Sequence, residues 1–326
     1  MSPLEPKKYS ERLGVIEPDQ LFEVAERFDL GTLTDAAPAA TGLFGQNIFL
    51  ETSKGAFVLR GHPHGHVQLT KERVVASIID ERSSLPAPWP YEICDETETF
   101  GWTYAIMPRL DGECGTALWE VADDEGKLDL AAAHGEALAL LHEATNPFFG
   151  PYDAQMDGFV AMEDFTDWTL HRIEHWRRAC RAVNALSTEA ERYLDELIER
   201  HAHALAEPFV PVLVHHDFTL GNVNFDADGF DPSGVFDLME AYFGDPEEDI
   251  VRMLWQLDKT QRRTFVDEYL AGETFRPGAA DRLALYAVCD WLVIWEYGCR
   301  VGGWFEDASF TERAAKIVRN AQAIGG

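Results

Sequence analysis

Residues 212–249 decide the interpretation of this chain: they read VLVHHDFTLGNVNF, a short turn-rich gap, and then GVFDLMEAYFGDPEED. The first apolar run ends at His215-His216-Asp217, and four residues separate Asp217 from Asn222. A second apolar run ends at Asp237. Asp and Asn are common turn formers, but here two carboxylates and one amide follow two short predicted strands. Phosphoryl transfer from a nucleotide uses such groups, one carboxylate to orient a hydroxyl and a carboxylate plus an amide oxygen to hold Mg²⁺.

The composition is that of a folded globular protein. The 326 residues are 46% hydrophobic and 12% aromatic, which is enough for one large domain or two lobes with a shared cleft. The longest apolar stretch, residues 286–298, is interrupted by Asp290 and Glu296, so no membrane span is expected. The N-terminus has no apolar core of a secretory signal, and the five cysteines show no CxxC spacing. We therefore expect a cytoplasmic protein.

The net charge of −30 limits the classes of partner. A strongly acidic surface repels nucleic-acid backbones and anionic lipids, so we expect neither nucleic acid nor a membrane as a partner. Such charge would favour cationic small molecules if part of it lines a pocket. The alternative is that it serves only solubility, because helix faces such as STEAERYLDELIER are typical solvated surfaces.

The order of predicted elements favours an α+β architecture with two lobes. The front of the chain is rich in strands, with a β-hairpin over residues 39–60 that turns at Ser53-Lys54-Gly55. Helices are expected over residues 17–30 and from Lys71 onward. Beyond a strand near residues 102–113 the chain is mostly helical. We place an N-terminal nucleotide-binding lobe at residues 1–106 and a C-terminal catalytic and substrate-binding lobe at residues 107–326.

A known family shares these motifs. The segment from His215 to Asn222 resembles the catalytic loop of the aminoglycoside phosphotransferase family, usually HGDxxxxN. Residues 237–246, DLMEAYFGDP, are similar to the family's following segment, and Asp249 matches a further Asp. The resemblance implies a two-lobed protein-kinase-like fold and transfer of the γ-phosphate of ATP, or of GTP, to a hydroxyl of a small molecule. His216 departs from the pattern, because the family usually has Gly there.

The resemblance also implies roles for single residues. Asp217 would be the catalytic carboxylate, and Asn222 and Asp237 would be Mg²⁺ ligands. His215, Asp245 and Asp249 would hold the frame of the loop.

On the nucleotide side, Arg60 resembles the strand cation that touches the phosphates, and Glu72, or else Glu81, would be its acidic partner. The loop that covers the nucleotide and the hinge that reads the adenine would supply Gly42, Gln46, Asn47, Met107 and Arg109.

The acceptor site is expected in the helical lobe. Acidic and aromatic groups there could hold a cationic acceptor, and the candidates are Glu240, Asp290, Trp295 and Glu296. The alternative is that the aromatic residues are buried core and the acids lie at helix edges. Alternate histidines at 62, 64 and 66 permit a metal site, although the intervening glycines and proline favour a solvated loop.

Three functions remain open at this point. The first is a phosphotransferase acting on a cationic antibiotic such as an aminoglycoside. The second is a metabolic kinase of choline, homoserine, a sugar or a ketosamine. The third is a non-catalytic nucleotide-binding module. All three imply a nucleotide partner. We expect a monomer or a homodimer.

Overall fold

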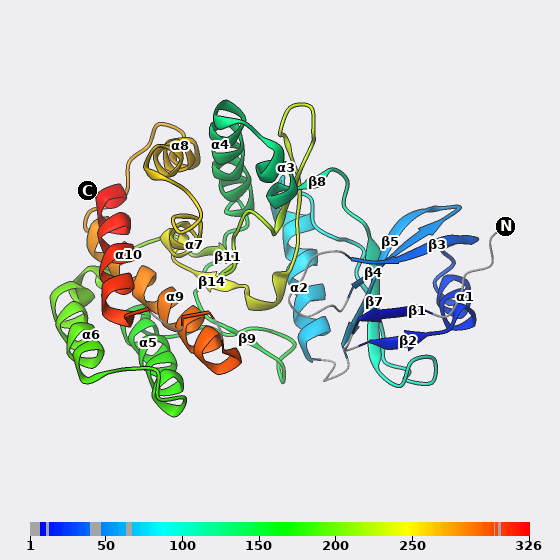
Figure 1. The fold of residues 1–326 in the computed structure, drawn as a ribbon, viewed down its shortest axis with the longest axis horizontal. Helices are drawn as coiled ribbons and strands as arrows, with labels where there is room; N and C mark the ends of the chain where they lie inside the picture. Colours follow the sequence, from blue (N-terminus) through cyan, green and yellow to red (C-terminus); the bar gives the residue numbers. More distant parts are fainter. Residues whose placement is uncertain (1–6, 11–12, 40–46, 63–66, 303, 306–307) are drawn as a thin grey trace. The chain divides into compact units, whose positions relative to one another are not determined.

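The computed structural model describes residues 7–10, 13–39, 47–62, 67–302, 304–305 and 308–326 (Figure 1). The chain forms two compact units. The first unit contains Met1–Gly112, Tyr152–Gly158 and Ser233–Met239, and the second contains Glu113–Pro151, Phe159–Pro232 and Glu240–Gly326. The lobe boundary between residues 106 and 107 stays a prediction, and two short later segments also belong to the first unit.

An antiparallel five-stranded sheet forms the centre of the first unit, with the strand order β3-β4-β5-β7-β6. Its strands are β3 (Leu33–Pro38), β4 (Asn47–Thr52), β5 (Gly55–His62), β6 (Glu92–Cys94) and β7 (Thr103–Pro108). The register pairs Arg60 with Asn47 on one side and with Ala105 on the other. Alternation along β4 buries Ile48 and Leu50, because successive side chains of a strand point to opposite faces.

The predicted hairpin is present as β4 and β5, and residues 40–46 of its expected first arm lie outside the described residues. The additional strand β3 was not anticipated. The remaining elements of this unit are β1 (Lys7–Ser10), β2 (Gly14–Ile16), α1 (Pro18–Arg27) and α2 (Val67–Arg82). Helix α2 starts at Val67, four residues before the expected Lys71, and buries Leu69 and Glu72 among others.

The second unit is mainly helical. Its helices are α3 (Gly115–Val121), α4 (Asp124–Leu141), α5 (Phe165–Ala182), α6 (Thr188–His201), α7 (Ile250–Met253), α8 (Lys259–Leu270), α9 (Ala279–Val301) and α10 (Phe310–Gly325). Side-chain oxygens of Asp123, Asp164 and Ser187 cap the N-termini of α4, α5 and α6. Helix α9 packs against α5, α6, α7 and α10 (Figure 1), and most of its residues are buried.

Short strands of the second unit carry the loop of interest. Strand β11 (Val212–Val214) pairs antiparallel with β14 (Tyr242–Gly244), and β12 (Val223–Phe225) pairs antiparallel with β8 (Glu113–Cys114). The pair Val214↔Tyr242 fixes the position at which the chain enters His215. The remaining short elements of the chain are β9 (Tyr152–Asp153), β10 (Gly158–Phe159), β13 (Pro232–Val235) and 3-10 helices at Ala202–Ala206, Leu238–Glu240 and Pro246–Glu248. Of these, β9 and most of β13 belong to the first unit.

These elements confirm the α+β class, because a strand-rich front is followed by a helical remainder. Within the described ranges, no helix is both long and apolar enough to cross a bilayer.

Candidate active site

The loop that follows β11 is anchored by one buried carboxylate. Asp249 accepts the backbone N–H of His215 at 2.6 Å and that of His216 at 2.7 Å. It also lies 3.2 Å from Nε2 of His142. His216 adopts φ 65°, in the left-handed region that favours glycine. The loop therefore keeps the backbone conformation of a glycine at this position, although it carries an imidazole.

Asp217 is held at both carboxylate oxygens. Nη1 of Arg252 donates to Oδ1 at 2.9 Å, and the Asn222 amide lies 3.3 Å from Oδ2. The same Nδ2 of Asn222 donates to the backbone carbonyl of Asp217 at 2.8 Å. Because the nitrogen of Asn222 is turned toward Asp217, the amide oxygen is left as the group that could coordinate a cation.

Arg252 itself is oriented by Asp290 of α9. Nε and Nη2 of Arg252 lie 2.8 and 2.6 Å from Oδ1 of Asp290, whose side chain is 5% exposed. Burial raises the pKa of Asp290 to about 6, although the adjacent guanidinium opposes this shift. The neighbouring carboxylates raise the pKa of Arg252 against the effect of its own burial. The result is a chain of three charges that runs from α9 to the catalytic loop.

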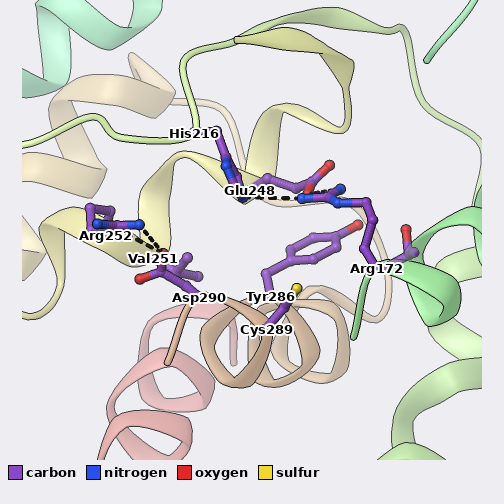
Figure 2. A pocket seen from close by; sticks show the side chains of 9 residues that line it. Arg172, His216, Glu248, Val251, Arg252, Tyr286, Cys289 and Asp290 are labelled. Atoms are coloured by element: carbon purple, nitrogen blue, oxygen red, sulfur yellow. Dashed lines mark hydrogen bonds and ion pairs between the residues drawn. The ribbon is translucent and has the colours of Figure 1, made fainter. Parts of the chain in front are cut away.

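A small polar cavity of about 10 Å³ adjoins this chain of charges (Figure 2). Its walls are Thr169, Arg172, His216, Glu248, Val251, Arg252, Tyr286, Cys289 and Asp290. The volume is close to that needed for one water molecule. Among the described residues, Oε1 of Glu248 and Oδ2 of Asp290 have no hydrogen-bond partner. Two arginines and two acids line the cavity, so its formal charge is balanced.

Arg172, which also lines this cavity, contacts the imidazole of His216 (Figure 2). Nη2 of Arg172 lies 3.2 Å from Nε2 of His216, so this nitrogen accepts and the neutral imidazole is favoured. Nη1 of Arg172 pairs with Glu248 at 2.7 Å, and the hydroxyl of Tyr242 donates to Glu248 at 2.6 Å. The ring of His216 also packs on that of Tyr242, with 5.2 Å between the ring centroids.

In the first unit, Arg60 contacts two carboxylates, the expected partner Glu72 and also Asp237. Nη2 of Arg60 lies 2.8 Å from Oε1 of Glu72 and 3.1 Å from Oδ1 of Asp237. The hydroxyl of Tyr91 donates to the other oxygen of Glu72 at 2.8 Å. Burial raises the pKa of Glu72, while Glu72 and Asp237 raise that of Arg60 against the effect of burial. The predicted Arg60–Glu72 pair is thus present, and Asp237 lies beside it.

The other nucleotide-side residues are placed as follows. Oδ1 of Asn47 accepts from Nη1 of Arg60 at 3.2 Å. Met107 is buried in β7 opposite Val58, and Arg109 lies over the ring of Phe49 at 4.1 Å and pairs with Glu51 at 3.3 Å. Gly42 and Gln46, like His64 and His66, lie outside the described residues.

The acceptor residues predicted in the helical lobe do not gather at Asp217. Asp290 reaches it through Arg252. Trp295 is buried, donates Nε1 to the carbonyl of Ala185 at 2.8 Å and stacks on Phe305. Glu296 pairs with Arg300 at 2.8 Å, and Glu240 is exposed. Trp295 therefore has the environment of a core residue, which was the alternative considered for it.

Asp245, a predicted frame residue, and Glu247 form another ion-pair network with arginines of the second unit. Asp245 is fully buried and accepts Nη2 of Arg276 at 2.6 Å and the hydroxyl of Tyr286 at 2.8 Å. Glu247 receives the buried guanidinium of Arg282 through two contacts of 2.8 Å. This network joins the segment of residues 244–247 to α9.

Arg172 and Arg252 were missed by the sequence reasoning. Arg252 follows Asp249 by three residues, about one helical turn, which was the available clue. Arg172 lies 44 residues before His216, in a helix with ordinary amphipathic spacing, and no local pattern identifies it.

An antiparallel sheet with a buried Arg–Glu pair, and a helical unit with an HxDx₄N loop, define a protein-kinase-like phosphotransferase. The model of the phosphotransferase enzyme family matches residues 35–286. The chain belongs to this family.

Solved structures agree with the fold. Aminoglycoside phosphotransferase APH(4)-Ia, as a thermostable mutant in ternary complex with ADP and hygromycin B, is 22% identical with a TM-score of 0.68. That match covers 92% of this chain and 97% of the other. The GDP complex of aminoglycoside 2'-phosphotransferase-IIIa is 16% identical with a TM-score of 0.64, covering 96% and 99%. Among curated protein sequences, none matches this chain at the threshold applied.

Proposed function

We propose that this protein is an ATP- and Mg²⁺-dependent O-phosphotransferase that phosphorylates a hydroxyl of a small molecule. The observation that carries the proposal is the support of Asp217: Arg252 and Asn222 contact its two carboxylate oxygens, and Asp249 holds the loop before it. A carboxylate held in this way can orient an attacking hydroxyl. The loose transition state of phosphoryl transfer demands positioning more than strong basicity.

In the proposed reaction, the acceptor hydroxyl donates a hydrogen bond to Asp217 and its oxygen bonds to the γ-phosphorus. The bond from that phosphorus to the bridging β–γ oxygen breaks and the nucleoside diphosphate leaves. Asp217 receives the proton of the hydroxyl as the new bond forms. Arg60, oriented by Glu72 and Asn47, would bind the nucleotide phosphates. The hinge around Met107 and Arg109 would contact the base. Gly42 and Gln46 would belong to the loop that covers the nucleotide.

The metal proposal depends on the chemistry of the donors. Among the described residues, no cluster of three or more His, Cys, Asp or Glu could hold a metal ion. Mg²⁺ in kinase sites uses one or two protein oxygens together with phosphates and water, so a dedicated cage is not needed. The carboxylate of Asp237 and the amide oxygen of Asn222 fit that requirement. Bound Mg²⁺ would neutralise charge on the β- and γ-phosphates.

For the acceptor, we propose first an aminoglycoside-like cationic alcohol, the class that hygromycin B in the solved complex represents. The second candidate is a metabolic acceptor of the choline, homoserine, sugar or ketosamine type, and one observation favours a neutral member of this group such as a sugar. Asp290 and Glu296, the buried acids expected to attract a cation, are already paired with Arg252 and Arg300. Paired carboxylates attract an additional cation less strongly than isolated ones.

A panel experiment tests the proposal. The purified protein is incubated with Mg-ATP or Mg-GTP and each of several acceptors, namely hygromycin B, other aminoglycosides, choline, homoserine, sugars and ketosamines. We expect phosphorylation of an alcohol that stops when EDTA removes the metal. Nucleotide binding without transfer to any acceptor or to water would instead support a non-catalytic nucleotide-binding module.

A further inference from the structure

Arg252 occupies a position between two carboxylates that belong to different parts of the second unit. One edge of its guanidinium, Nε and Nη2, faces Oδ1 of Asp290 on α9. The remaining nitrogen, Nη1, faces Oδ1 of Asp217. The side chain of Arg252 is 16% exposed, against 33% for Asp217 and 5% for Asp290. A buried acid thus fixes a guanidinium whose free end reaches the more exposed acid of the catalytic loop.

The geometry of the guanidinium explains how Asp290 can influence the orientation of Asp217 through Arg252. The group is planar and its donors form a rigid fork. When Asp290 receives two donors of this fork, the direction of the third is set. Arg252 and Asn222 contact different oxygens of the Asp217 carboxylate, so Arg252 contributes to fixing the rotation of that carboxylate.

Other arginines of the same unit show what a purely structural pair is like. Arg276 and Arg282 bind Asp245 and Glu247, whose side chains are 0% and 4% exposed. These carboxylates are deep in the protein and belong to no exposed loop. Arg252 differs because one of its two partners is partly open to solvent and has the proposed catalytic role.

We propose that Arg252 is a positioning residue for Asp217, and that Asp290 acts through Arg252 by fixing the plane of its guanidinium. This inference rests on the proposed function of Asp217. It assigns Asp290 to the support of the catalytic carboxylate instead of to direct contact with a cationic acceptor. Arg252 and Asp290 should then act as one unit, so that removal of either has nearly the effect of removing both.

The test compares Arg252→Gln, Arg252→Lys, Asp290→Asn and the double variant Arg252→Gln/Asp290→Asn. Phosphoryl transfer from Mg-ATP is measured with the best acceptor of the panel and with water. The affinity for AMP-PNP is measured separately. Arg263→Gln is the matched control, because Arg263 forms an exposed ion pair with Asp267 in α8.

We expect Arg252→Gln to lower kcat by about 10- to 100-fold, the size of effect that misplacement of a reacting group produces. The affinity for AMP-PNP should stay unchanged, and Arg252→Lys should be intermediate. The double variant should be no worse than Arg252→Gln alone, because groups that act as a unit are not additive. Wild-type kcat in folded Arg252→Gln, or additive losses in the double variant, would overturn the proposal.

A further measurement separates this inference from the proposed function. If the wild-type protein transfers phosphate to no acceptor of the panel and not to water, the proposed function fails. Nuclear magnetic resonance titration of Asp290 then tests whether Arg252 holds it. Because Arg252 lowers the pKa of Asp290 from the value that burial alone would give, Arg252→Gln should raise that pKa further above its ordinary range. An unchanged pKa would show that the two groups are not joined, and would overturn the inference independently.

Discussion

Replacement of Arg60 by methionine should weaken nucleotide binding. Arg60 is the buried cation of the first unit, and its guanidinium contacts Asn47, Glu72 and Asp237. A hydrogen bond to a charged group contributes about 1.5–3 kcal/mol. Since about 1.4 kcal/mol corresponds to a tenfold change in affinity, loss of one phosphate contact should raise the Kd for Mg·AMP-PNP by about 10- to 100-fold.

The same substitution should also destabilise the protein, and this effect must be separated from binding. The side chain of Glu72 is 4% exposed, so Arg60→Met leaves a buried carboxylate without its counter-ion. Breaking a buried pair in this way costs about 3–5 kcal/mol. Protonation of Glu72 reduces the cost, because burial already raises its pKa. The double variant Arg60→Met/Glu72→Gln removes the orphaned charge and should recover much of the stability.

The assay combines isothermal titration with Mg·AMP-PNP and urea unfolding. Lys54→Met is the control, because Lys54 is an exposed cation at the other end of the β4–β5 hairpin, paired with Asp29. We expect weak binding in both Arg60 variants and normal binding in the control. If the double variant is as stable as the wild type and binds the nucleotide with wild-type affinity, the role of Arg60 is refuted.

Three further outcomes are expected. Burial raises the pKa of Asp290 to about 6, and the nearby carboxylates of Asp217 and Asp249 contribute to this shift. Above about pH 6 Asp290 is therefore ionised and holds Arg252. The kcat should therefore fall as the pH drops through about 6, and a kcat–pH profile of Asp290→Asn should lack this step. In urea unfolding, His216→Ala should have a free energy of unfolding about 1 kcal/mol lower than that of His216→Gly. Both variants lose the imidazole, but only alanine keeps a Cβ at φ 65°. Equal stabilities would contradict the strained backbone. Asp249→Ala should cost about 2–6 kcal/mol in urea unfolding, since it leaves two backbone N–H groups of the loop without their acceptor; a loss below about 1 kcal/mol would refute the anchoring role of Asp249.

The sequence predicted the parts of the site that are local along the chain. The HxDx₄N spacing predicted that Asp217 and Asn222 belong to one loop, and in the structure Asn222 donates to the backbone carbonyl of Asp217. The pairing of Arg60 with Glu72 was anticipated from the family resemblance, and the structure has this pair. The α+β class followed from the same hydrophobic patterns.

The environment of Asp217 could not be predicted, because it depends on tertiary packing. Arg252 and Asp290 are 38 residues apart and lie on α7 and α9. An arginine in a short helix has the same local pattern whether it faces solvent or a carboxylate. For the same reason the sequence could not show that Asp290 and Glu296 are paired with arginines. The expectation of a cationic acceptor assumed that these two carboxylates are unpaired.

The most direct test of the central claim is phosphoryl transfer by Asp217→Asn. The amide keeps the shape of the carboxylate and removes its charge and its capacity to accept the proton. With Mg-ATP and the best acceptor of the panel, we predict a kcat at least about 100-fold below wild type, as is usual for loss of a general base, with unchanged affinity for AMP-PNP. Transfer at the wild-type rate by folded Asp217→Asn would contradict the account.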